Sequence, residues 1–162
     1  MTIMQRKTYC FEDLELGMEA DFQKTVAEAD IVSFAEVSGD KNPVHIDAEY
    51  AAKTIFKQRI AHGMLTAAYI SAVLGMRLPG PGCVYVSQTL NFKAPVKIGD
   101  VITVIVEVVE LIEKGRRAKL KCECLVDGKV VLDGEAFVMV PSREQIIRAA
   151  APAPLEEKPA SA

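Results

Sequence analysis

The sequence has no tryptophan, only two histidines, and four cysteines that form no CxxC pair. Cys122 and Cys124 are two residues apart, which places both side chains on one face of a strand and suits neither a redox motif nor a zinc knuckle. Unpaired cysteines are typical of a reducing compartment. We therefore expect free thiols in a cytoplasmic protein, and the cysteine pattern indicates neither a metal site nor a cofactor.

The chain also lacks a block of basic residues, and its net charge is −3. This balance disfavours nucleic acid binding, although a local group of basic residues would still suit an anionic ligand. No apolar run approaches the roughly 20 residues that span a bilayer, and residues 1–17 contain no apolar core of a secretion signal. We expect neither a nucleic acid nor a membrane as partner.

Apolar residues make up 50% of the 162 residues, and the mean hydropathy is +0.17. A chain of this length forms one domain that buries roughly 70% of its unfolded surface and needs no disulfide. The apolar excess indicates a subunit interface. We assign residues 1–10 to an N-terminal extension, 11–141 to a single domain, and the Ala-, Pro- and Glu-rich residues 142–162 to a disordered tail.

The first half of the domain has helical patterns and the second half has strand patterns. The predicted helices are 25–37, 48–56 and the almost uncharged 61–78, and Pro43 keeps the loop 40–47 free of helix. The predicted strands are 18–25, 83–92, 101–111, 118–126 and 129–140, with a hairpin turn at Asp127-Gly128. Since a helix that is apolar all round must be buried, the economical arrangement wraps a curved antiparallel sheet around 61–78. This is an α+β architecture, the hot-dog fold.

Both histidines, His45 and His62, fall within residues 40–65. Asp40 and His45 flank the dipeptide Asn42-Pro43, so their side chains can converge from the two ends of a tight loop. A carboxylate and an imidazole that share one water molecule can carry out general acid–base chemistry. In the alternative interpretation Asp40 caps a turn and His45 is an ordinary packed histidine.

His62 and Gly63 open the apolar helix, where free backbone N–H groups attract developing negative charge. Gly63 also lets a ligand approach the backbone closely. Ser71 follows Met64 by seven residues and therefore shares its helix face. The alternatives are an ordinary helix start and a serine that bonds back to a carbonyl one turn earlier.

Two other kinds of site fit the sequence less well. A metal site from His45, Asp47 and His62 would have a spacing that matches no familiar pattern. A serine hydrolase needs a nucleophile on a sharp turn, and the sequence has no G-x-S-x-G motif. We therefore predict no metal.

The segments 38–47 (SGDKNPVHID) and 60–65 (IAHGML), with Tyr50 and Phe56 between them, closely resemble the hydratase-2 signature of MaoC-like proteins. Residues 11–17 (FEDLELG) and 90–100 (LNFKAPVKIGD) are similar to further segments of that family. The resemblance covers about residues 11–140. It is strongest to the short, single-domain (R)-specific enoyl-CoA hydratases that supply polyhydroxyalkanoate synthesis from fatty-acid oxidation.

The resemblance implies a hot-dog homodimer that acts on an acyl-CoA thioester, with Asp40 and His45 as the catalytic acid–base pair. It also implies that the Gly63 amide binds the thioester oxygen and that Ser71 is the active-site serine of the family. We expect further substrate contacts from three residues of the same segments: Asn42, His62 and Met64.

Other functions stay open at this point. A hot-dog thioesterase would direct water at the thioester carbonyl carbon rather than at C3, and the intact Asp-x4-His loop argues against it. A non-catalytic module would bind acyl-CoA without turnover. A related hydratase would take a branched or dicarboxylic acyl chain, or one carried by acyl carrier protein. Lys93 and Lys97 are candidates for the CoA phosphates, although such lysines are more often simply solvated.

Overall fold

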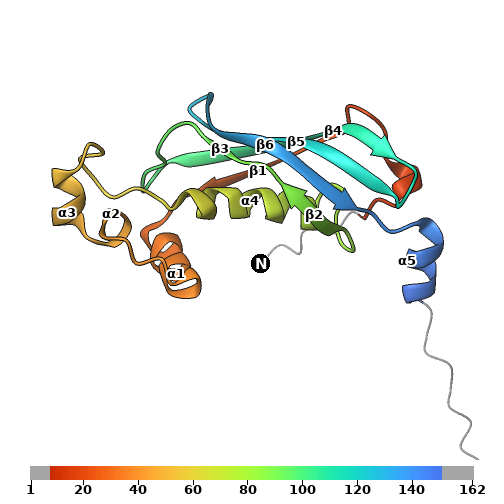
Figure 1. Ribbon diagram of the computed structural model, residues 1–162, viewed down its shortest axis with the longest axis horizontal. Helices are drawn as coiled ribbons and strands as arrows, with labels where there is room; N and C mark the ends of the chain where they lie inside the picture. The colour runs from red at the N-terminus through yellow and green to blue at the C-terminus, as the bar shows by residue number, and fades with distance from the viewer. Residues whose placement is uncertain (1–7, 151–162) are drawn as a thin grey trace, which may run out of the picture.

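In the computed structural model, which describes residues 8–150, a twisted antiparallel sheet covers one side of helix α4 (Gly63–Met76) (Figure 1). The strand order is β1-β4-β5-β6-β2, and β3 also pairs with β6. The strands are β1 (Glu19–Thr25), β2 (Val84–Gln88), β3 (Asn91–Phe92), β4 (Val101–Ile112), β5 (Arg117–Val126) and β6 (Lys129–Met139). This arrangement confirms the predicted α+β fold, with an antiparallel sheet around an apolar helix.

The core lies between α4 and the inner face of the sheet. Alternate residues of β4 and β5 are buried on that face, and Cys122 and Cys124 lie there together, as their spacing predicted. One face of α4 packs into this core through large side chains such as Ile70 and Leu74. The opposite face is open, with Met64 56% exposed. Within the single chain α4 is therefore buried on one side only, and not all round as its composition suggested.

Turn chemistry sets the hairpin between β5 and β6. Asp127 and Gly128 both have positive φ, 49° and 74°, which the two-residue turns favoured in hairpins require. The predicted turn at Asp127-Gly128 is confirmed.

The single strand predicted at 83–92 is divided into β2 and β3 by a bend at Thr89. The bend lies against Gly134 of β6, where a Cβ would come within 1.8 Å of the Thr89 carbonyl oxygen. The Thr89 N–H donates to the Glu135 carbonyl, and the Thr89 hydroxyl accepts the Glu135 N–H, both at 2.9 Å. Only glycine permits this approach, and the bend brings β3 to the start of α4.

Three short helices lie together beyond the N-terminal end of α4: α1 (Glu28–Ser38), α2 (Pro43–Ile46) and α3 (Ala48–Lys53) (Figure 1). Helix α1 ends at Gly39, whose φ of 77° is left-handed. Asp47 caps α3 by accepting the Tyr50 N–H at 2.9 Å, as predicted. The prediction that Pro43 keeps its loop free of helix is wrong. Pro43 is the first residue of α2, where its missing N–H and fixed φ favour a helix, and Asn42 supplies the cap.

Helix α5 (Arg143–Ala150) occupies the start of the segment that we predicted to be disordered. Ser142 and Gln145 form a capping box, in which each side chain accepts the other residue's backbone N–H. Arg143 also forms an ion pair with Asp13 of the short helix η1 (Phe11–Asp13). These contacts correct the prediction for 143–150, whereas 151–162 and 1–7 lie outside the described residues. The domain limits 11–141 stay a prediction.

Candidate active site

Local hydrogen bonds within the loop between α1 and α2 fix the position of Asp40. The Asp40 N–H donates to the Ser38 hydroxyl, and Asp40 Oδ1 accepts the Asn42 N–H, both at 3.1 Å. The Asn42 side chain accepts the Val44 N–H at 3.2 Å, which starts α2. Short polar side chains stabilise turns in this way. One Asp40 carboxylate oxygen is thus held, and among residues 8–150 no donor bonds the other.

His45 lies on α2 and is 8% exposed. Its Nδ1 is 2.8 Å from the carbonyl oxygen of Ile60. Because a carbonyl oxygen can only accept, we assign a proton to Nδ1. Nε2 is then the ring atom that accepts a proton when the ring is neutral and donates one when the ring is charged.

Asp40, His45 and His62 each bring one carboxylate oxygen or ring nitrogen within 4.8 Å of the others. Asp40 and His45 therefore converge as predicted, although His45 lies on the short helix α2 and not in a loop. Within residues 8–150 no hydrogen bond joins the Asp40 carboxylate to either imidazole. This spacing leaves room for a water molecule that contacts both the carboxylate and the His45 ring.

His62 is 2% exposed and contacts both members of the predicted pair. Its Nε2 donates to the backbone carbonyl of Asp40 at 2.9 Å. Its ring stacks on the His45 ring, with centroids 3.8 Å apart and an angle of 27° between the planes, and it also contacts the Phe34 ring, with centroids 5.0 Å apart. These contacts give His62 a role in positioning Asp40 and His45, and because it also lines the cavity beside them, the substrate contact predicted for it stays a prediction.

Two imidazoles and a carboxylate are also ligands that a divalent metal prefers. The geometry fits such an ion poorly. Imidazole lone pairs lie in the ring plane, and the stacked rings of His45 and His62 cannot both direct theirs at a common ion. His45 Nδ1 and His62 Nε2 already donate to carbonyl oxygens, while His62 Nδ1 is buried without a partner. Asp47, the third residue of the metal site weighed in the sequence analysis, instead caps α3.

A cavity of about 520 Å³ opens beside the three side chains. Asp40 and His45 line it together with Gly63 and Met64 from the start of α4 and Phe92 from β3. The carbonyl of His62 accepts the N–H groups of the third and fourth residues of α4. The Gly63 and Met64 amides bond no acceptor among residues 8–150. The cavity is therefore bordered by a carboxylate, an imidazole and two free N–H donors.

A second cavity of about 560 Å³ lies farther along α4, bounded by that helix and β2. Met64 lines both cavities, whereas Ser71 and Tyr85 line only the second. Met64 and Ser71 therefore share one face of α4, as predicted. Ser71 does not line the cavity of Asp40 and His45, and the catalytic role predicted for it stays a prediction.

The remaining predicted residues have structural partners. Asn42 caps α2 and lines neither cavity, which argues against the substrate contact predicted for it. Lys93 lines the first cavity but forms an ion pair with Asp133 at 2.7 Å. Phe92 is a lining residue that sequence reasoning did not single out, although it lies inside the segment 90–100 that carries part of the family resemblance.

Comparison with known proteins places this chain in a family. The family model of the MaoC like domain matches residues 13–127. The chain is 58% identical to a 3-hydroxybutyryl-CoA dehydratase from Methylorubrum extorquens, over 83% of this chain and 86% of that protein. It is 54% identical to an (R)-specific enoyl-CoA hydratase from Rhodospirillum rubrum, over 82% and 92%.

The same relationship holds for the fold. A solved (R)-hydratase from A. caviae, described as involved in PHA biosynthesis, is 41% identical and superposes with a TM-score of 0.78. The superposition covers 80% of this chain and 99% of that one. The chain belongs to the family of MaoC-like proteins and has their hot-dog fold.

Proposed function

We propose that the chain is an (R)-specific enoyl-CoA hydratase, which adds water to a trans-2-enoyl-CoA and catalyses the reverse dehydration. The observation that carries the proposal is the convergence of the Asp40 carboxylate and the His45 imidazole, without a bond between them, beside the free amides of α4. The names of the two curated relatives support the CoA thioester and both directions of the reaction.

Hydration needs an oxygen at C3 and a proton at C2. The water molecule lies between Asp40 and His45, and its oxygen bonds to C3 while Asp40 accepts one of its protons. His45 enters this step as the charged ring, with a proton on both nitrogens, and Nε2 gives its proton to C2 because Nδ1 is committed to the Ile60 carbonyl. Transfer of the proton from Asp40 to His45 then restores both groups. Each such acid–base group accelerates a reaction by about 10²–10⁴-fold.

As C3 is attacked, negative charge develops on the thioester oxygen. The Gly63 N–H, at the positive end of α4, is the donor for this oxygen. One donor of this kind stabilises a transition state by roughly 3 kcal/mol in comparable sites. The carboxylate, the imidazole and the amide thus act on three different atoms of the same reaction.

The second cavity is the proposed acyl pocket. It continues from Met64 along the open face of α4, and its lining is mostly apolar, with Ala67, Val86 and Leu90 among its residues. Ser71 belongs to this pocket as a lining residue. An apolar pocket with few polar groups is suited to an alkyl chain. The solved hydratase from A. caviae is described as involved in PHA biosynthesis. In the same way, the (R)-3-hydroxyacyl product of this chain would serve polyhydroxyalkanoate synthesis.

The same surface supports a homodimer. Strand β2 is an edge of the sheet, and Val84, Tyr85 and Val86 are 40–53% exposed on it. The open face of α4 with Met64 lies on the same side of the chain, across the second cavity. A second copy that pairs with β2 would satisfy the edge and bury both apolar surfaces. Sedimentation at micromolar concentration tests this, with a 17.6 kDa species contradicting it.

Two further features concern the setting of the enzyme. All four cysteines are free thiols, which supports the proposed cytoplasmic location. Among the described residues no helix is both long and apolar enough to cross a membrane.

The test is the ultraviolet absorbance of crotonyl-CoA after addition of the enzyme, with chiral analysis of the product and a thiol reagent in a parallel cuvette. Loss of the conjugated double bond without free thiol, yielding (R)-3-hydroxybutyryl-CoA, is the expected result. Release of thiol instead would indicate a thioesterase. Binding of the thioester with neither signal, also for longer acyl chains, would indicate a non-catalytic module.

A further inference from the structure

The aromatic ring of Phe92 lies directly on the start of α4. A Cβ at Gly63 would come within 2.7 Å of Phe92 Cε1 and 2.8 Å of Cδ1, so the ring occupies the space that any other residue at 63 would need. Phe92 is nevertheless 55% exposed and lines the first cavity. A large apolar ring that is neither buried in the core nor directed away from the site has a face left for a ligand.

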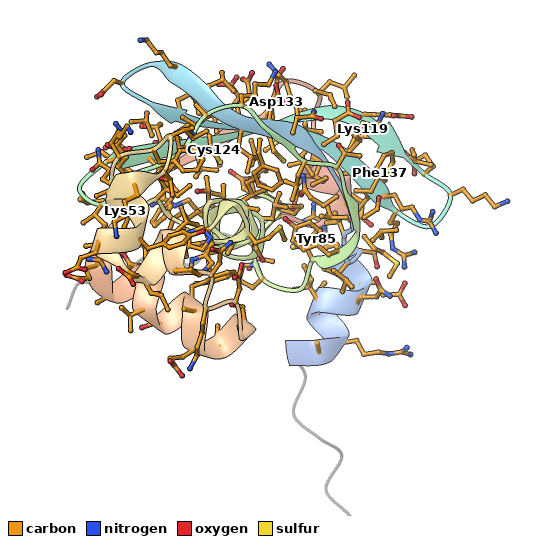
Figure 2. All side chains as sticks on the ribbon, turned by 60° about the vertical axis from the view of Figure 1, so that its left-hand side comes forward. Lys53, Tyr85, Lys119, Cys124, Asp133 and Phe137 are labelled. Atoms are coloured by element: carbon orange, nitrogen blue, oxygen red, sulfur yellow. The ribbon has the colours of Figure 1, made fainter. Side chains whose placement is uncertain are left out.

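The two residues next to Phe92 in the chain, Asn91 and Lys93, are both attached to Asp133 of β6. Asn91 donates to Asp133 Oδ1 at 2.9 Å, and Lys93 forms an ion pair with Asp133 Oδ2 at 2.7 Å. These two bonds keep the pKa of the Asp133 carboxyl below its usual value, the Lys93 contact contributing most. Asp133 lies on the outer surface of the sheet, away from α4 (Figure 2). Since side chains alternate along a strand, Phe92 points from β3 to the inner side.

The register places the ring over the site. Phe92 pairs with Leu132, which is fully buried and lines the same cavity, and Asn91 pairs with Asp133. Strand β3 has only two residues, so few ladder bonds hold it. The N–H groups of Lys93 and Ala94 continue the pairing by donating to the Val131 carbonyl, and the double attachment to Asp133 adds the side-chain restraint on β3.

We propose that Phe92 is a specificity-determining residue that excludes acyl thioesters branched at C2, and that Asp133 is the positioning residue that holds it. The inference rests on the proposed function. The thioester carbon whose oxygen meets the Gly63 amide also carries C2. The ring that packs on Gly63 therefore lies beside C2. A flat, unbranched enoyl group passes along this wall, whereas a methyl group on C2 requires the space of the ring.

The experiment compares kcat/KM for crotonyl-CoA and for its 2-methyl derivative in the same preparation of each variant. The wild type should strongly prefer the unbranched substrate. One methyl group in a close-fitting pocket is worth about 10–200-fold in discrimination, and Phe92→Ala should remove about tenfold of it or more. Phe92→Leu should remove less. Because both substrates meet the same enzyme molecules, the ratio does not change with the fraction that is folded.

Asp133→Ala should lower the discrimination in the same direction as Phe92→Ala, because β3 loses both attachments. Glu123→Ala is the matched control. Glu123 is the cross-strand partner of Asp133 on β5 and forms its own ion pair with Lys121, and among residues 8–150 no hydrogen bond or ion pair joins either side chain to β3. Its ratio should equal that of the wild type.

An unchanged ratio in Phe92→Ala would overturn the assignment of Phe92. A changed ratio in Phe92→Ala with no change in Asp133→Ala, or with an equal change in Glu123→Ala, would overturn the role of Asp133. A wild-type enzyme that hydrates neither crotonyl-CoA nor longer unbranched enoyl-CoA thioesters would overturn the proposed function and this inference together. Hydration of the unbranched substrate by the wild type therefore shows whether the proposed function or only the role of Phe92 has failed.

Discussion

Replacement of Asp40 by Asn removes the proposed base and leaves the loop intact. The amide oxygen of asparagine can still accept the N–H of Asn42, which Asp40 Oδ1 accepts at 3.1 Å. The side chain is exposed, and its backbone N–H and carbonyl keep their bonds to Ser38 and His62. We therefore expect the free energy of unfolding to change by less than about 0.5 kcal/mol, the usual range for such surface substitutions.

The same substitution should nearly abolish the reaction. An amide in place of the carboxylate cannot accept the proton of the attacking water. The loss should be about 10²–10⁴-fold in kcat, which corresponds to roughly 2.7–5.4 kcal/mol at 1.36 kcal/mol per factor of ten. KM should change little, because Asp40 acts on the water and not on the thioester. Steady-state hydration of crotonyl-CoA measures both constants, and urea unfolding checks the fold.

Asp47→Asn is the matched control, with the same chemical change seven residues farther along the chain. Asp47 caps α3 by accepting the Tyr50 N–H, and it does not line the cavity. Asparagine caps helices as well as aspartate does, so this variant should keep its activity. A folded Asp40→Asn enzyme with near wild-type kcat would refute the assignment of Asp40 as the base. Equal losses in both variants would attribute the effect to the loop rather than to the carboxylate.

Three further substitutions or measurements test other parts of the structure. His62→Leu should lower kcat by about 10–100-fold with little change in KM, because Asp40 loses the donor to its carbonyl; His62→Gln, which restores an N–H, should recover part of it. Gly134→Ala should lower the free energy of unfolding in urea by about 3 kcal/mol, since its Cβ would overlap the Thr89 carbonyl. Burial raises the pKa of the Cys124 thiol to about 12, so a thiol reagent at pH 8 should label it only after unfolding.

Features governed by local chemistry were predictable from the sequence. The end of α1 follows from Gly39, the start of α3 from Asp47, and the last hairpin from Asp127-Gly128. The bend that divides β2 from β3 was not predictable, because its cause is the missing side chain at Gly134, on a strand more than 40 residues away. A local pattern cannot show which strand lies across that glycine.

The site likewise has features that follow from the local sequence and features that depend on the complete sheet. The convergence of Asp40 and His45 follows from the short loop between them, and the free amide at Gly63 from its place at a helix start. The contact of Phe92 with Gly63 depends on the pairing of β3 with β6, which only the complete sheet defines. Ser71 shares the helix face of Met64 as its spacing predicted, but spacing along one helix does not show which cavity that face lines.

The proposed catalytic groups are held by polar contacts rather than by the core. Asp40 and His45 lie on the loop and helix beyond the end of α4, and the residues after α3 connect them to the rest of the domain. The Ile60 carbonyl accepts from His45 Nδ1, and the Ile60 N–H donates to the Val44 carbonyl at 3.3 Å. The next residue but one, His62, donates to the Asp40 carbonyl.

These three residues, 60–62, are themselves fixed to the body of the domain. Ile60 forms a β-bridge with Lys97, and the Ala61 N–H donates to the Val96 carbonyl at 2.7 Å. The same short segment that positions the Gly63 amide thus also positions the carboxylate and the imidazole. Since a displacement of about 1 Å can cost a factor of about 10² in rate, one shared segment keeps all three groups in register even if the helices beyond α4 move relative to the sheet.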